Sequence, residues 1–302
     1  MIYQLVEIFF NVITPVFALV LIGYLAGPRL GLEARTLSRL AYFVLIPSFV
    51  FNVMSSAKME AALATRMVAY ILIVHVAVAG VAFLTAWLLK RPPKMIGAYV
   101  VIAVFGNVGN FGLPLIEFRL GPEAITAATI YFLAIVVISF VISVAAASWH
   151  QGGSVTAVLA VFKTPALLAL IPALFFNLTN ITPLLFLTRI TGLLGNAMVP
   201  IMLVALGVQL AATKQMQINR DTLQATGIRL LGAPILAILL VVPFGLTGIE
   251  RGAGIFQASM PTAVLASIIA LEYDLLPDFV TTAVLFSTLA SVITLTILLS
   301  FV

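Results

Sequence analysis

The sequence has no cysteine, only two histidines and few charged residues. Of its 302 residues 8% are charged, as 15 Lys or Arg and 10 Asp or Glu side chains. Without cysteine, disulfides, thiolate metal ligands and cysteine nucleophiles are excluded. His75 and His150 are too few for a metal centre built from several histidines. Because soluble domains carry about 25% charged residues, we also exclude a water-soluble globule of this length.

Apolar residues are instead distributed along the whole chain. Hydrophobic residues make up 63% of it and the mean hydropathy is +1.24, which excludes a soluble domain with one anchor. A helix needs about 20 mostly apolar residues to cross a bilayer, and these runs are continuous, unlike the alternating strands of a membrane β-barrel. We predict an all-α polytopic membrane protein with ten transmembrane helices, at residues 5–26, 36–55, 64–89, 95–116, 123–148, 156–176, 184–211, 223–244, 254–271 and 279–301.

The basic residues near the predicted helix ends are unevenly divided, ten on one side and five on the other. Since Lys and Arg accumulate in cytoplasmic loops, we assign the net charge of +5 to this bias and expect no nucleic-acid partner. Both termini are then predicted outside the cytoplasm, in the cell (inner or plasma) membrane. The first ten residues hold no Lys or Arg, so we expect no cleavable signal peptide. The ten predicted cytoplasmic residues are Arg29, Arg35, Arg39, Lys90, Arg91, Lys94, Lys163, Lys214, Arg220 and Arg229.

The two halves of the chain share a weak repeat. Residues 117–128 align with residues 272–283 at an offset of 155, which pairs Glu117 with Glu272 and Pro122 with Pro277. Coincidence is the alternative, because proline followed by an acidic residue begins many helices. Five helices per unit is an odd number, so a duplicated second half would be inverted in the membrane. The repeat predicts two five-helix units, residues 1–150 and 151–302.

Two of the predicted helices contain helix-breaking residues near mid-membrane. Residues 106–114 read Gly-Asn-Val-Gly-Asn-Phe-Gly-Leu-Pro, and residues 257–263 read Gln-Ala-Ser-Met-Pro-Thr-Ala. Backbone groups freed by such breaks cannot face lipid, and paired broken helices indicate a transport site whose half-helix N-termini suit a carboxylate. The alternative is that small residues allow close helix packing. The candidate substrate-binding residues are Asn107, Gly109, Asn110, Pro114, Gln257, Ser259, Met260 and Pro261.

The two prolines of these breaks, Pro114 and Pro261, are 147 residues apart, eight fewer than the repeat offset. This difference predicts an insertion of about two turns between the halves.

These residues resemble the auxin efflux carrier family, which includes plant auxin exporters and bacterial carriers assigned to malonate or malate. The resemblance covers essentially the whole chain. Its pieces are residues 45–51 (Leu-Ile-Pro-Ser-Phe-Val-Phe), 106–114, 199–200 with 205–207, and 260–263 with 272–273. The connection at 150–156 is short, so the resemblance is to members without a long central loop, and more distantly to bile acid–sodium symporters.

The resemblance implies ten helices in inverted repeats whose fourth and ninth helices are broken and cross at prolines. Helices 1, 2, 6 and 7 would form a scaffold, and helices 3–5 and 8–10 a mobile transport domain with elevator-like alternating access. Pro114 and Pro261 would be the crossing prolines, and Asn107 and Asn110 would lie beside the substrate carboxylate. Family members are often homodimers.

Other polar residues are weighed separately. His75 lies centrally in the third predicted helix. Two roles are open for it: a proton or polar relay, or a neutral hydrogen-bonding partner of a neighbouring helix. Arg229, near the start of the eighth predicted helix, is expected to extend its side chain to the membrane interface. Glu272 and Asp274 are expected at a solvated helix end. Asn52, Asn177, Asn180 and Asn196 are expected to bond neighbouring helices.

Nucleotide-binding, zinc-protease and serine-hydrolase signatures are missing. We therefore expect neither an enzyme nor a cofactor or metal site, but a secondary or potential-driven carrier of a small organic anion, with H⁺ or Na⁺ coupling left open. A sodium-coupled symporter of the bile-acid type and a passive channel are the alternatives.

Overall fold

The computed structural model describes residues 2–148, 163–212 and 217–301, and within these ranges the chain is helical. Seven of its helices are long and apolar enough to cross a membrane, and each overlaps one predicted span. The all-α polytopic prediction is therefore confirmed. The seven are Val6–Leu30, Ala34–Ser55, Ala61–Leu88, Pro122–Ala147, Leu185–Ala212, Arg220–Leu240 and Pro277–Leu299.

Several of these membrane-length helices consist of more than one helical segment. Successive segments are α1 (Ile2–Ile8), η1 (Phe9–Ile13) and α2 (Thr14–Leu30), then α3 (Ala34–Leu40), η2 (Ala41–Leu45) and α4 (Ile46–Ser55). They continue with α5 (Ala61–Leu88), α6 (Pro93–Val104), η3 (Val108–Gly112), α7 (Leu113–Leu120), η4 (Pro122–Ala124) and α8 (Ile125–Ser148). The second half has α10 (Pro165–Thr179), α11 (Leu185–Ala212), α12 (Arg220–Gly227), η6 (Ile228–Gly232), α13 (Ala233–Leu240), η7 (Val242–Phe244), α14 (Gly248–Ala258), α15 (Val264–Glu272) and α16 (Pro277–Leu299).

Three predicted spans are shorter in the structure. The spans predicted at 95–116 and 254–271 are each interrupted, as α6 with α7 and as α14 with α15. Of the span predicted at 156–176, the first residues lie outside the described ranges and the rest belongs to α10. The short connection at 150–156, with His150, also lies outside them.

Widened π-helical turns precede four prolines. The segments η1, η2, η3 and η6 each end two residues before a proline, namely Pro15, Pro47, Pro114 and Pro234. Proline has no amide hydrogen and its ring crowds the preceding turn. A turn with an extra residue accommodates the ring, so these helices continue through their prolines.

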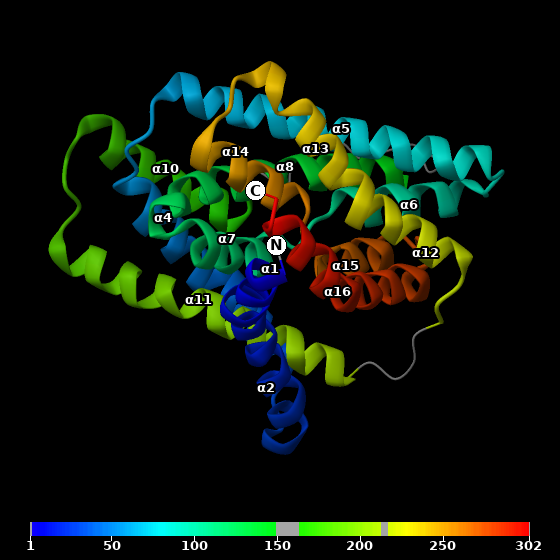
Figure 1. Cartoon of the computed structure of the whole chain (residues 1–302). Coiled ribbons are helices and arrows are strands. Elements are labelled where there is room, and N and C mark those ends of the chain that lie inside the picture. The colour runs from blue at the N-terminus through cyan, green and yellow to red at the C-terminus, as the bar shows by residue number, and fades with distance from the viewer. Residues whose placement is uncertain (1, 149–162, 213–216, 302) are drawn as a thin grey trace.

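The helices pack in two groups (Figure 1). In one group α2 packs on α11, and α4 on both α10 and α11. In the other, α5, α6 and α8 pack together, and α12 to α16 pack around them. Contacts between the groups include η3 with α11, α7 with η1, and α1 with α16, which brings the two chain ends together.

The contact of α2 with α11 depends on glycine. A Cβ atom on Gly207 would lie only 1.9 Å from the carbonyl oxygen of Val20, and one on Gly23 would lie 2.1 Å from that of Val204. Without those side chains the two backbones approach closely, as is common between membrane helices.

Polar pairs join three connections at one end of the second group. Arg91 donates to Asp221 at 2.8 Å, Tyr99 donates to the same carboxylate at 2.6 Å, and Lys94 donates to Asp274. The hydrogen bond and charge of Lys94 lower the pKa of the exposed Asp274 carboxyl. The expected solvated position of Asp274 is confirmed, since its side chain is 81% exposed.

Candidate functional site

The two interrupted helices meet at their breaks. After α6 ends at Val104, residues 105–107 are non-helical, and residues 259–263 separate α14 from α15. Gly106 and Thr262 form an antiparallel bridge. The amide of Asn107 donates to the carbonyl of Pro261 at 2.7 Å, and the amide of Ala263 donates to that of Phe105 at 2.7 Å. We call this paired stretch, residues 105–107 and 261–263, the crossing.

The crossing corrects the predicted alignment of the prolines. Asn107 and Pro261, which pair, are 154 residues apart, and Gly106 and Thr262 are 156 apart. Both separations lie within one residue of the offset of 155, and the two-turn insertion stays a prediction. Pro261 lies in the crossing, but Pro114 lies in α7, where the widened turn η3 accommodates it.

The carbonyl groups at the end of α6 are bonded by side chains from three other elements. Thr262 Oγ1 donates to Ile102 at 3.0 Å, Arg229 Nη1 to Ala103 at 2.9 Å, and Ser139 Oγ to Val104 at 2.8 Å. The last carbonyls of a helix have no donor within it, and buried carbonyls need one. These side chains therefore satisfy the carbonyl groups at the end of α6 and stabilise the break.

Arg229 also reaches the second break. Its Nε donates to the carbonyl of Met260, two residues after the end of α14, at 2.6 Å, and its side chain is only 1% exposed. The prediction that Arg229 reaches the membrane interface is therefore wrong. Arg229 lies nine residues after the start of α12, about 14 Å along the helix, and cations are favoured at helix C-termini.

Four buried side-chain atoms around the crossing have no hydrogen-bond partner among the described residues. They are Nδ2 of Asn107, Oε1 of Gln257, Nε2 of His75 and Nη2 of Arg229. The other amide atom of Gln257, Nε2, donates to Ala128 at 3.1 Å. An unpartnered buried polar atom costs about 1–3 kcal/mol, so a bound ligand or water is the expected partner.

The remaining predicted site residues lie beside the crossing in different environments. Asn110 is partly exposed in the middle of η3, whereas Gly109 is buried, and a Cβ there would lie 3.2 Å from the ring of Phe132. Met260 is buried, and the hydroxyl of Ser259 donates to Ile255 within its own helix at 2.6 Å. The first amides of η3 and α15 precede the first intrahelical hydrogen bonds, which makes both starts suited to an anion.

His75 is buried on α5, which packs on the turn η6 that carries Arg229. Its Nδ1 lies 2.9 Å from the carbonyl oxygen of Ile71. A carbonyl only accepts, so Nδ1 carries the hydrogen, and in the neutral ring Nε2 is then an acceptor. His75 is thus placed to accept a hydrogen bond, while its role as a relay stays a prediction.

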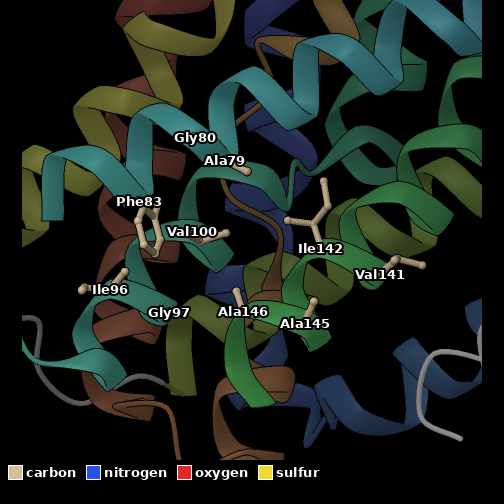
Figure 2. Close-up of a pocket in the computed structure, with 10 residues that line it drawn as sticks. All are labelled: Ala79, Gly80, Phe83, Ile96, Gly97, Val100, Val141, Ile142, Ala145 and Ala146. Carbon is tan, nitrogen blue, oxygen red and sulfur yellow. The ribbon is translucent and has the colours of Figure 1, made fainter. Parts of the chain in front are cut away.

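A cavity of about 510 Å³ lies away from the crossing, between α5, α6 and α8 (Figure 2). All the residues that line it are apolar, and their side chains in Figure 2 contain only carbon. A small anion needs polar partners, so this cavity does not compete with the crossing as an anion site. Its lining residues are Ala79, Gly80, Phe83, Ile96, Gly97, Val100, Val141, Ile142, Ala145 and Ala146.

Sequence reasoning missed the side chains that hold the breaks, namely Arg229, Thr262 and Ser139. One signal was available for Arg229, because it lies nine residues after Arg220 and directly before the apolar run that begins at Leu230, too deep for a helix end. The two hydroxyl residues carry no such signal.

Comparisons with known proteins agree with a membrane carrier. The profile of the membrane transport protein family matches residues 8–157 and again residues 154–299. The chain is 29% identical to an uncharacterized transporter of Methanothermobacter thermautotrophicus over 286 residues, which are 93% of this chain and 94% of that protein. It is 23% identical to an uncharacterized transporter of Methanocaldococcus jannaschii over 278 residues, 88% and 89% of the two chains. The chain belongs to this membrane transport protein family, that of the auxin efflux carriers.

Proposed function

We propose that the protein is a secondary or potential-driven carrier of a small organic anion, such as an auxin-like acid or a dicarboxylate, and that the anion binds at the crossing. The observation that carries this proposal is the pairing of two interrupted helices at the crossing, where η3 and α15 begin and where buried polar atoms lack partners among the described residues. Such half-helix starts attract carboxylates.

The proposed architecture is ten transmembrane helices in two inverted five-helix repeats, residues 1–150 and 151–302. Two observations support it. The family profile matches the chain twice, once in each half. In addition, under an offset of 155 the bridge between Gly106 and Thr262 maps onto the pair of Pro261 and Asn107, as a two-fold axis through the crossing requires.

The two packing groups suggest how the anion would cross. The scaffold would comprise α1 to α4, α10 and α11, and the transport domain would comprise α5 to α8 and α12 to α16. In an elevator-type mechanism the second group, with the crossing, moves against the first. Support comes from the extensive packing within each group, and from the contact of η3 with α11, which places the crossing next to the scaffold.

The membrane orientation is proposed from the basic residues. The end at which Arg91 pairs with Asp221, and Lys94 with Asp274, would face the cytoplasm. The two termini would then lie on the opposite side of the cell membrane. H⁺ or Na⁺ coupling and a homodimer belong to the same proposal as features to be tested.

The test is transport into proteoliposomes with radiolabelled organic anions. Asn107→Ala and Asn110→Ala are expected to raise the half-saturation concentration about tenfold, because each removes a buried or half-buried amide from the site. Asn180→Gly is the matched control, since Asn180 is an exposed turn residue with φ of 56° that glycine adopts easily. Wild-type affinity in both site variants would remove the crossing as the site.

The same vesicles separate the alternatives. A carrier shows saturation and counterflow, in which internal unlabelled anion accelerates uptake of label, whereas a channel shows neither. A strict requirement for external Na⁺ would instead favour a symporter of the bile-acid type.

A further inference from the structure

Two backbone carbonyl groups converge on one point behind the crossing. Ala103 belongs to the last turn of α6, and Met260 follows the end of α14. Carbonyl oxygens at the ends of interrupted helices are ligands that carriers use for Na⁺, because hard cations prefer oxygen. In this chain both oxygens instead accept hydrogen bonds from the guanidinium of Arg229, at 2.9 Å and 2.6 Å.

The charges of this arrangement balance without a carboxylate. Each helix C-terminus carries roughly half a negative charge, so the ends of α6 and α14 together offset about one positive charge. Among the described residues the ion pairs are those of Arg91 with Asp221 and of Lys94 with Asp274. Arg229, 1% exposed, is therefore held by backbone dipoles.

The backbone of the crossing is shaped to admit this guanidinium. A Cβ atom on Gly106 would lie 2.3 Å from Nη2 and 3.0 Å from Cζ of Arg229. The direction in which that Cβ would point marks the side of the crossing on which Arg229 lies.

We infer that Arg229 is a tethered cation that occupies the carbonyl site where a coupling metal ion would otherwise bind, so that transport does not depend on Na⁺ or K⁺. The statement about ion dependence rests on the proposed function, because it concerns transport. The statement that the guanidinium holds the crossing does not depend on that function. Arg229 is thus a positioning residue that holds the two ends of the crossing together.

The first experiment needs no substrate. The melting temperatures of the wild type and of Arg229→Ala are measured in detergent with millimolar guanidinium chloride, with choline chloride and urea as controls. Guanidinium is expected to refill the vacated site and raise the melting temperature of the variant by about 3 °C, and to leave the wild type unchanged. An equal response of the two proteins would overturn the tethered-cation assignment.

The second experiment uses proteoliposomes with the wild type, Arg229→Lys and the uncharged Arg229→Met. Wild-type uptake is expected to be equal in Na⁺, K⁺ and choline media, and Arg229→Lys is expected to retain more activity than Arg229→Met. Uptake that requires Na⁺, or equal activity of the two variants, would contradict the inference. If the wild type transports no organic anion, the proposed function fails, and the thermal experiment still tests Arg229. The two variants also serve if Arg229→Ala does not fold.

Discussion

Adding a single methyl group at Gly106 tests whether the crossing depends on the guanidinium behind it. In Gly106→Ala the new Cβ would lie 2.3 Å from Nη2 of Arg229. Real Cβ contacts do not come so close, so the guanidinium must move. Its two hydrogen bonds, to the carbonyls of Ala103 and Met260, are then stretched or lost.

The cost follows from these contacts. A hydrogen bond to a charged group contributes about 1.5–3 kcal/mol, and overpacking a close-packed interior costs about 1–3 kcal/mol. Alanine recovers at most about 1 kcal/mol by restricting the unfolded chain. We therefore expect Gly106→Ala to lower the free energy of unfolding by about 2–5 kcal/mol. For a chain of this length the melting temperature then falls by about 5–15 °C.

The assay is thermal unfolding in detergent, with Gly227→Ala as the matched control. Gly227 is a helical glycine at the end of α12, and no atom lies within 4 Å of where its Cβ would be. We expect this variant to be as stable as the wild type or more stable, by up to about 1 kcal/mol, because alanine favours the helix.

A double-mutant cycle identifies the cause. If the methyl group acts by displacing the guanidinium, Gly106→Ala costs little once Arg229→Ala has removed it. The coupling between the two substitutions is then expected to exceed about 1 kcal/mol. A cost of Gly106→Ala that is the same in both backgrounds would refute this reasoning, and so would a Gly106→Ala variant as stable as the Gly227→Ala variant.

Two further predictions concern other parts of the fold. Gly207→Ala is expected to lower the melting temperature strongly, since its Cβ would lie 1.9 Å from the carbonyl oxygen of Val20, whereas Gly192→Ala on the same helix has ordinary space and is the control. Equal melting temperatures would contradict the close packing of α2 on α11. For Asp274, the hydrogen bond from Lys94 lowers the pKa of the carboxyl in the folded state. Its contribution to stability is therefore present above the unfolded pKa and lost as the pH falls through the folded pKa. Asp274→Asn is expected to flatten the melting temperature across that acidic range, and an unchanged pH profile would argue against the pair.

The sequence alone predicted the breaks because their cause is local. Clustered glycine, asparagine and proline destabilise a helix wherever it lies. α14 ends within the predicted stretch at 257–263, and α6 ends two residues before the stretch at 106–114. The two breaks were also expected to meet, but at Pro114 and Pro261. Which residues pair depends on where each helix unwinds, and α7 continues through Pro114 because η3 is widened.

Arg229 illustrates what local patterns cannot supply. Near a helix start, an arginine normally extends to the interface, and only the nine residues between Arg220 and Arg229 oppose that expectation in the sequence. The decisive partners, Ala103 and Met260, are 126 and 31 residues away. Their carbonyls become acceptors only because two other helices end there. Thr262 and Ser139 were missed for the same reason, since their hydroxyls act on carbonyls far along the chain.

The proposed repeat also suggests why a single cation suffices. At the repeat offset of 155 the counterpart of Arg229 in the first half is Val74, so the polar side chains to compare at this level are those of Arg229 and of the next residue, His75. Both side chains are buried, but His75 bonds the carbonyl of Ile71 in its own helix, while Arg229 bonds both breaks. The ends of α6 and α14 together offset only about one positive charge, so a second permanent cation in the same apolar interior would lack compensation. Imidazole can remain neutral. A backbone with approximate two-fold symmetry can thus be stabilised by an asymmetric pair of side chains, one charged and one neutral.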